Sequence, residues 1–181
     1  PQFTHILTMF SNPILGMLAG AILTAIIQSS SASVGILQAL CATGAVNFST
    51  ALPIIMGQNI GTCVTAIISS IGTSKNAKRA AAVHLFFNIS GTVIFMVVFY
   101  TLNTFVHFSF LNTAASPAGI AVIHSLFNIG ATILLFPFAN LLEKMAILAI
   151  PDKGSEVEEM EEEKINPDLA RLDERFLDKP G

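Results

Sequence analysis

The distribution of charge along the chain constrains its fold more than any other feature of the sequence. No Asp or Glu occurs from Pro1 to Leu142, and the only formal charges in that stretch are Lys75, Lys78 and Arg79. A soluble domain of this size needs a charged surface. In contrast, each Asp, Lys or Arg at mid-bilayer depth costs about 2.5–3.5 kcal/mol on insertion. We therefore predict an all-α, polytopic membrane protein up to the point where the charges begin.

Two apolar runs are long enough to cross a hydrocarbon core, which takes about 20 residues. They extend from about residue 83 to residue 100 and from about residue 119 to residue 142. The three basic residues come just before the first run, and the positive-inside rule places them in the cytoplasm. The connection at 101–116 then lies outside, and the acidic segment after residue 142 is cytoplasmic.

The region from residue 13 to residue 70 has a different pattern. Polar segments separate short apolar stretches at 14–27, 34–40, 51–56 and 64–68. These stretches are too short to span a bilayer alone and are typical of half-helices in broken-helix transporter sites. We predict two broken or re-entrant hairpins. Irregular backbone at membrane depth is tolerated only beside protein or a water-filled cavity, which makes a binding site the usual reason for such breaks.

Two polar segments carry the chemistry of these hairpins. The first is Gln28-Ser29-Ser30-Ser31-Ala32-Ser33, where hydroxyls and a starting helix can hold an anion. The second is Gly57-Gln58-Asn59-Ile60-Gly61-Thr62, followed by Thr65, where glycines allow close backbone approach and side chains supply oxygens. A site without carboxylates suits sodium better than a divalent cation. These residues alone predict a site for sodium and a small oxyanion.

One motif occurs twice, at an offset of 40 residues, once in each predicted span. The shared pattern is His-x-x-Phe-Asn-Ile-x-x-Thr, beginning at His84 and at His124. A spacing of four places the His, Asn and Thr of each copy on one helix face. We expect these residues to be hydrogen-bond partners between helices, with a role as ligands or proton carriers as the alternative.

These motifs, in this order, resemble the type II sodium–phosphate cotransporter family. The resemblance rests on Gln28–Ser31, on Gly57–Ala66 and on His84–Gly91, and it covers about residues 13–142. Members of that family contain two inverted repeats, each with a Gln-Ser-Ser motif, and bind phosphate and sodium between them. Only one such motif is present here, so the chain resembles the second repeat plus a linker. Because it begins at Pro1 with no initiator Met, we expect it to start inside a longer protein.

The resemblance implies sodium-coupled symport of inorganic phosphate by alternating access across the cell membrane. It implies no enzymatic activity, no cofactor besides sodium as the coupling ion, and no nucleic-acid partner. The expected partners are phosphate, sodium, the lipid bilayer, and either the missing first repeat or a second copy of the chain. The phosphate-binding residues would be Gln28, Ser29, Ser30 and Ser31. The sodium-binding residues would be Gln28, Ser30, Asn59, Thr62 and Thr65. We expect a cavity-lining or structural role for Gly57, Gly61, His84, Asn88, His124 and Asn128.

Three domains are predicted from these patterns. They are the membrane repeat at 1–145, an acidic cytoplasmic linker at 146–165 and the start of a cytoplasmic helix at 166–181. Six Glu among the eight residues at 156–163 favour a solvated linker. Asn166 and Pro167 are typical of a helix start. The segment at 172–177 is similar to the junction where bacterial family members join a PhoU-like helical domain.

Two other functions stay open at this stage. The chain could be a structural membrane anchor for a cytoplasmic regulatory domain, although an anchor gains nothing from polar breaks at membrane depth. It could also be an intramembrane hydrolase, with one of Ser29–Ser31 as nucleophile and His84 or His124 as base. Consecutive serines, however, do not single out one nucleophile, and the sequence has no Gly-x-Ser-x-Gly elbow.

Overall fold

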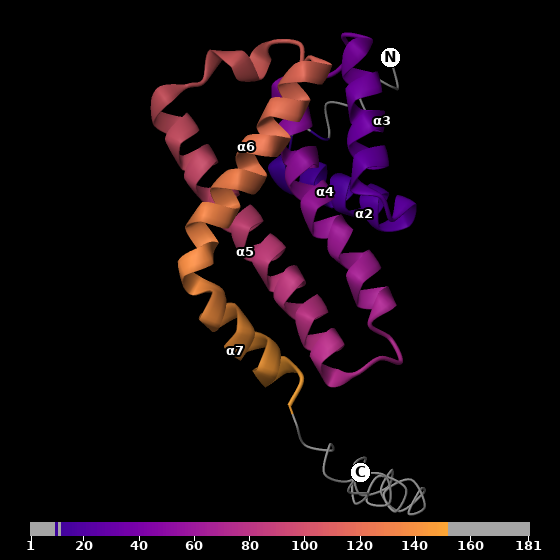
Figure 1. The fold of residues 1–181 in the computed structure, drawn as a ribbon. Coiled ribbons are helices and arrows are strands. Elements are labelled where there is room, and N and C mark those ends of the chain that lie inside the picture. Colours follow the sequence, from indigo (N-terminus) through magenta and orange to yellow (C-terminus); the bar gives the residue numbers. More distant parts are fainter. Residues whose placement is uncertain (1–9, 11, 152–181) are drawn as a thin grey trace, which may run out of the picture. The chain divides into compact units, whose positions relative to one another are not determined.

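The computed structural model describes residue 10 and residues 12–151, and the regular elements within them are helices (Figure 1). This confirms the predicted all-α fold class. The elements are α2 (Pro13–Ile27), α3 (Ser30–Ala42), α4 (Phe48–Ser69), α5 (Lys75–Val106), the 3-10 helix η1 (Ser109–Asn112), α6 (Pro117–Leu135), the 3-10 helix η2 (Phe136–Phe138) and α7 (Ala139–Ala149). They all belong to one compact unit, Pro1–Ala149, and Ile150–Gly181 form a second unit.

Within the described residues, three helical stretches are long and apolar enough to cross a membrane. They are α4, α5 and the run Pro117–Ala149. The two predicted spans correspond to the second and third of these. With 32 residues, α5 is about 48 Å long, longer than the roughly 30 Å hydrocarbon core. It therefore extends past the apolar run at both ends and takes the basic residues into its first turns.

The second span changes its helical form at η2. Pro137 lies in this 3-10 segment, and proline cannot donate to the α-helical hydrogen-bond ladder. The helix resumes as α7, which packs against α5. Residue 145, the predicted end of the membrane repeat, falls inside α7, which ends at Ala149. The domain boundaries stay predictions, since most of the linker at 146–165 and all of the helix at 166–181 lie outside the described residues.

The first of the two predicted hairpin breaks is present. Two shorter apolar helices, α2 and α3, are separated only by Gln28 and Ser29. The second predicted break, at Gly57–Thr62, is wrong because α4 continues without interruption through this segment. Its polar side chains fit a continuous helix by donating hydrogen bonds to backbone carbonyls one turn earlier. One example is the amide of Asn59, whose Nδ2 lies 3.1 Å from the carbonyl oxygen of Ile55.

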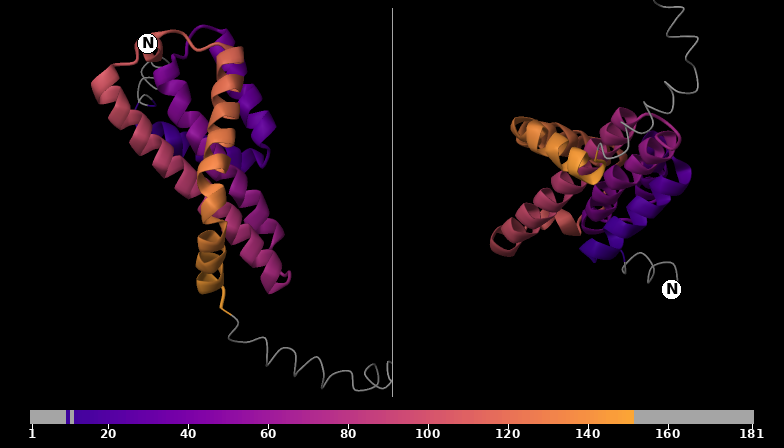
Figure 2. Two further views of the ribbon diagram at one scale, coloured as in Figure 1. Left: turned by 60° about the vertical axis from the view of Figure 1, so that its left-hand side comes forward. Right: turned by 90° about the horizontal axis from the view of Figure 1, so that it is seen from below.

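The central helix of the unit is α4. About 56% of its apolar stretch is buried, compared with 17% in α5 and 22% in Pro117–Ala149. Helix α4 contacts α2 and α3 as well as α5 and α6. In Figure 2, α2 lies on one side of α4 and α5 on the other, and α3 packs against both α4 and α6. The helix in which the sequence predicted a break is thus continuous, and the others pack around it.

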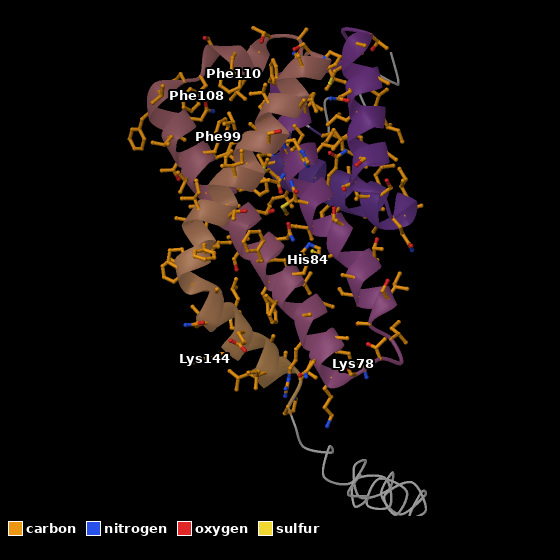
Figure 3. All side chains as sticks on the ribbon, viewed as in Figure 1. Lys78, His84, Phe99, Phe108, Phe110 and Lys144 are labelled. Carbon is orange, nitrogen blue, oxygen red and sulfur yellow. The ribbon has the colours of Figure 1, made fainter. Side chains whose placement is uncertain are left out.

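Two chain connections meet at one end of these helices. The backbone N–H of Phe48 donates to the carbonyl of Thr113 at 3.1 Å, and that of Ala115 donates to the carbonyl of Val46 at 2.8 Å. Aromatic rings pack at this end of α5. The ring centroids of Phe99 and Phe108, for example, are 5.4 Å apart in a stacked pair. Figure 3 shows Phe99, Phe108 and Phe110 on the opposite side of the unit from Lys78 and Lys144, so the charged and aromatic ends are separate.

Candidate functional site

The two half-helices α2 and α3 meet at Gln28 and Ser29. Gln28 has a left-handed backbone (φ 57°), and its N–H donates to the carbonyl of Thr24 at 2.7 Å. Ser29 is extended and is the N-cap of α3, because its Oγ accepts the N–H of the residue three positions later at 3.3 Å. Ser30 and Ser31 are then the first helical residues, and the N–H groups at such positions have no acceptor within their own helix. The break therefore presents a capped helix N-terminus beside several hydroxyls.

The four predicted phosphate ligands lie together at this break. Gln28, Ser29 and Ser31 are exposed on the chain, and Ser30 is half-buried. Their side chains are not enclosed by the other helices of the unit. A molecule adjoining the break can therefore reach all four residues.

Immediately behind the break, a buried polar cluster joins three helices. Thr24 of α2, Ser33 of α3 and Gln58 of α4 are each at most 1% exposed. The Oγ1 of Thr24 and the Oγ of Ser33 are 2.7 Å apart, and Gln58 Nε2 donates to both the carbonyl and the Oγ of Ser33 at 3.0 Å. Among the described residues, Gln58 Oε1 is buried without a hydrogen-bond partner. An unsatisfied buried acceptor costs about 1–3 kcal/mol, so a ligand that supplies a positive charge or a donor here would be favoured.

None of these three residues is in the set of ligands predicted from the sequence. Ser33 and Gln58 do lie inside the two polar segments, and Thr24 is the one polar residue in the second half of an otherwise apolar helix. The position of Thr24 as a polar residue in an apolar helix was the sequence signal that could have marked it as part of a site. However, the number of residues between Thr24, Ser33 and Gln58 does not show that their side chains are in contact.

Glycines set the distance between α2 and α4. A Cβ built on Gly57 would collide with the backbone carbonyl of Met17, and one on Gly61 with that of Ala21. A Cβ on Gly20 of α2 would likewise collide with the backbone of α4. Small residues four apart are typical of membrane helices whose backbones touch. The close approach that Gly57 and Gly61 allow is therefore made by α2, which gives both residues a structural role.

Two of the predicted sodium ligands of α4, Thr62 and Thr65, lie on the same helix face as Gln58. Gln58, Thr62 and Thr65 are spaced at i, i+4 and i+7, so they follow one another along the helix. Thr62 and Thr65 are half-buried, and the Oγ1 of Thr62 donates to the carbonyl of Gln58 at 2.9 Å. Asn59 is 7% exposed and lies one turn before Cys63, on the same helix face. One turn later, Cys63 Sγ donates to the carbonyl of His84 on α5 at 3.6 Å.

The His-Asn-Thr stripe of α5 faces α4. Asn88 is 7% exposed, and its Nδ2 donates to the carbonyl of His84 at 3.0 Å. Thr92 is fully buried, and its Oγ1 contacts the carbonyl of Met56 on α4 at 3.4 Å. Figure 3 shows His84 on α5 at the side toward α4. This stripe thus links α5 to α4.

The matching stripe of α6 makes contacts within its own helix. Asn128 Nδ2 donates to the carbonyl of His124 at 2.7 Å, and Thr132 Oγ1 donates to the carbonyl of Asn128 at 2.8 Å. His124 and Asn128 are half-buried, and Thr132 is exposed. The structure thus does not bring this stripe to the helix break.

The helices that form the site carry no formal charge. Asp, Glu, Lys and Arg are all absent from the sequences of α2, α3 and α4. Across the described part of the chain, there is no group of three or more His, Cys, Asp or Glu side chains with the arrangement of a metal site. The chemistry available here is that of neutral oxygens, amides and a helix N-terminus, which suits a monovalent cation and an anion.

Comparison with known proteins adds an independent observation. A family model described as Na+/Pi-cotransporter matches residues 1–127. The uncharacterized protein YqeW of Bacillus subtilis (strain 168) is 34% identical over 138 residues, which are 76% of this chain and 44% of that protein. Sodium-dependent phosphate transport protein 2B of Homo sapiens is 36% identical over 103 residues, covering 54% of this chain and 15% of that protein. Sodium-dependent phosphate transport protein 2A of Rattus norvegicus is 41% identical over 86 residues, covering 44% and 14%. The chain spans less than half the length of these relatives, and no solved structure matches it.

Proposed function

Because the chain belongs to the Na+/Pi-cotransporter family, we propose that it forms part of a secondary transporter in which downhill sodium entry drives phosphate uptake by alternating access. Membership confirms the resemblance seen in the sequence. It also confirms that the chain is not an enzyme, because this is a family of transporters. The apolar helices and the family together make it a membrane protein. Placement in the cell membrane with the acidic tail in the cytoplasm is part of the proposal.

Phosphate is proposed to bind at the start of α3. The helix begins in an uncharged environment with Ser29 as its N-cap, and the first N–H groups of a helix together carry about half a positive charge. The hydroxyls of Ser29, Ser30 and Ser31 and the amide of Gln28 would add hydrogen bonds to the oxyanion. The absence of acidic side chains from these helices avoids repulsion of the anion. This helix break is the observation that carries the proposal.

Sodium is proposed to bind between the break and α4. Gln58 Oε1 supports this placement, because it is a buried neutral acceptor without a partner in the described part of the chain. A cation near it would satisfy that acceptor while the Nε2 of the same side chain keeps its contacts with Ser33. We therefore add Gln58 to the predicted ligands Gln28, Ser30, Asn59, Thr62 and Thr65.

The rest of the site is proposed to come from a second repeat. The residues at the break are largely exposed on this chain, and the relatives extend well beyond the matched length. A first repeat from a longer chain, or a second copy of this one, would cover Gln28, Ser29 and Ser31. Closing and opening of this contact would then expose the ions to the two sides in turn.

The two other functions receive less support from the geometry. Among the described residues, no hydrogen bond joins a hydroxyl of Ser29–Ser31 to the ring of His84 or His124, as a hydrolase would require. A simple anchor would not need the buried cluster of Thr24, Ser33 and Gln58, because a polar group buried without a partner destabilises the fold.

Uptake of radiolabelled phosphate into vesicles containing the chain tests the proposal. We expect uptake with an inward sodium gradient that is at least tenfold higher than with a matched potassium gradient. Ser30→Ala should lower uptake, whereas Ser125→Ala makes the same change on an exposed position of α6 and should leave it unchanged.

A second measurement covers the case in which this chain is half of the transporter. The thermal midpoint of the purified chain should rise with sodium and rise further with sodium plus phosphate, because ligands that bind only the folded state stabilise it. Phosphate uptake or binding that is equal in sodium and in potassium would contradict the coupling.

A further inference from the structure

Ser33 lies between the two proposed binding sites, although it is a predicted ligand of neither ion. Its N–H donates to the carbonyl of Ser29, the N-cap residue of α3, at 3.0 Å. Its Oγ and its carbonyl oxygen each lie 3.0 Å from Nε2 of Gln58 on α4. One buried residue therefore contacts both the helix start proposed for phosphate and the amide proposed for sodium.

Ser33 also attaches the start of α3 to the other helices. The buried residues of α3 are Ser33, Leu37 and Cys41, which are four apart and share one helix face. Leu37 and Cys41 belong to the hydrophobic core and hold the later turns of the helix. At the first turn the buried residue is polar instead, and its side chain contacts Thr24 and Gln58. These hydrogen bonds hold the helix start against α2 and α4.

Helices α2 and α4 are joined to each other more extensively than either is joined to α3. A Cβ added to Gly57 or Gly61 of α4 would collide with the backbone of α2, so the two backbones are already in contact. Thr24 and Gln58 therefore lie on a pair of helices with little freedom to separate or rotate. The first turn of α3 meets this pair through Ser33, which makes it the element whose position can respond to a ligand.

The orientation of the Gln58 amide is fixed by the Ser33 carbonyl. A backbone carbonyl only accepts hydrogen bonds, so the amide atom 3.0 Å from it has to be the nitrogen. The amide oxygen then needs another partner, and within the described residues it is buried without one. A buried acceptor left unpaired destabilises the arrangement that leaves it so. The contact between Gln58 and Ser33 is therefore weakened as long as no cation or donor reaches this oxygen.

From these contacts we propose that Ser33 is a positioning residue, through which sodium at Gln58 holds the start of α3 in place for phosphate. This role rests on the proposed function, because it requires both ions at the site. Sodium beside Oε1 pairs the buried oxygen and polarises the amide, which makes its N–H groups stronger donors to Ser33. Because coupling between two ligands is reciprocal, phosphate at the helix start would raise the affinity for sodium by the same factor.

Amide hydrogen exchange of the purified chain in detergent, resolved by residue, tests this link. We expect sodium, compared with potassium, to slow exchange of the N–H of residue 33 by roughly tenfold. The N–H groups of α7, which packs against α5, are the internal control. A general gain in stability would slow exchange in both helices, whereas the proposed link slows it at the start of α3 and leaves α7 nearly unchanged.

Two variants weaken the link without replacing a proposed ligand. Ser33→Ala leaves Gln58 only the carbonyl contact, so the effect of sodium on residue 33 should fall to less than about twofold. Thr24→Val removes the neighbouring hydroxyl at nearly the same side-chain volume and should reduce the effect in part. Thr24→Ser keeps that hydroxyl and should keep the effect. Ser125→Ala, at an exposed position of α6, is the matched control and should behave like the unchanged chain.

The thermal midpoint in sodium, measured on the same samples, separates this link from the proposed function. If sodium raises the midpoint of Ser33→Ala but no longer slows exchange at residue 33, the variant is folded and binds sodium, and the link is supported. If Ser33→Ala keeps the full slowing, or if sodium slows α7 as much as residue 33, the link is wrong while the sodium site stands. If Ser33→Ala fails to fold, Thr24→Val and Thr24→Ser decide in the same way. If sodium changes neither the midpoint nor the exchange of the unchanged chain, the proposed sodium site fails and the link fails with it.

Discussion

The two sides of α4 are built in different ways. On the side of α2 and α3, backbones touch through glycines, and buried polar groups join the three helices. On the side of α5 and α6, Thr92 Oγ1 and Cys63 Sγ donate to backbone carbonyls across the contact between α4 and α5. Helix α5 also packs on α6 through aromatic rings such as Phe95 and Phe127, whose centroids are 5.3 Å apart. Only 17% of the apolar stretch of α5 and 22% of that in Pro117–Ala149 is buried within this chain. The contacts with α2 and α3 fix the arrangement of these helices on α4. Helices α5 and α6 leave surface that lipid or a partner can cover.

The repeated His-Asn-Thr motif shows the same contrast within one sequence pattern. Its α5 copy faces α4, with Thr92 fully buried, whereas its α6 copy leaves Thr132 exposed. In both copies the Asn donates to the carbonyl of the His one turn earlier. The internal hydrogen bond therefore belongs to the motif, and the contact between helices depends on the neighbour. An identical polar stripe does not imply an identical role.

The strongest test of this contrast compares two glycines. Gly57→Ala should destabilise the fold by about 3 kcal/mol or more, because the new Cβ collides with the backbone of α2 and backbone has little room to move. Gly130→Ala on α6 should be neutral or stabilising by up to about 1 kcal/mol, because beyond the neighbouring backbone of its own helix no atom lies within 4 Å of the added Cβ, and Ala favours helix.

Thermal unfolding of both variants in detergent, with the unchanged chain alongside, measures the difference. Equal midpoints for Gly57→Ala and Gly130→Ala would show that the backbone contact between α2 and α4 is not needed for stability.

A second test separates the stability of the buried cluster from its proposed ligand. Gln58→Leu removes two hydrogen bonds to Ser33 but also removes the unsatisfied Oε1, so without sodium the net loss should be only about 1 kcal/mol. The stabilisation by sodium should disappear, since the proposed acceptor is gone. Thermal midpoints in sodium and in potassium measure both effects.

Gln38→Leu is the matched control for this change. Gln38 of α3 donates to the carbonyl of Pro117 at 3.0 Å and lies outside the cluster. Its sodium-dependent stabilisation should equal that of the unchanged chain. A full sodium response in Gln58→Leu would remove Gln58 from the proposed site while leaving the family assignment intact.

Apolar length and capping residues were enough to predict part of this fold. The runs within α5 and α6–α7 are close to the length that spans a hydrocarbon core, and the break at Gln28–Ser29 follows from a polar run with a good N-cap. The segment Gly57–Thr62 looked like a second break because its polar residues and glycines interrupt the apolar pattern. Its glycines are instead covered by α2, and its amides bond within the helix or across to α3. Those partners are distant in sequence, so hydropathy does not reveal them.

The candidate site was predictable to a similar degree. Ser29–Ser31 could be placed at a helix start because capping is a local property of the chain. The meeting of Thr24, Ser33 and Gln58 depends on how three helices cross, and that crossing is set by glycine contacts between α2 and α4. Spacing along the chain gives no measure of such a crossing. The residues missed were therefore the buried ones, whose neighbours come from other helices.

The smallest expected change in stability comes from replacing the threonines of the repeated motif, one in α5 and one in α6. Thr92→Val removes a hydrogen bond of 3.4 Å to the carbonyl of Met56, and hydrogen bonds between membrane helices average about 0.6 kcal/mol. Thr132→Val removes only a contact within its own helix, at a position that is exposed on this chain. The purified chain should lose stability by roughly that amount in the first variant and be nearly unchanged in the second. If the purified chain loses as much from Thr132→Val, then another copy already covers that face of α6, and the difference between the two stripes disappears. Repeating the pair at high dilution would decide this, because a loss caused by a second copy must fall with protein concentration.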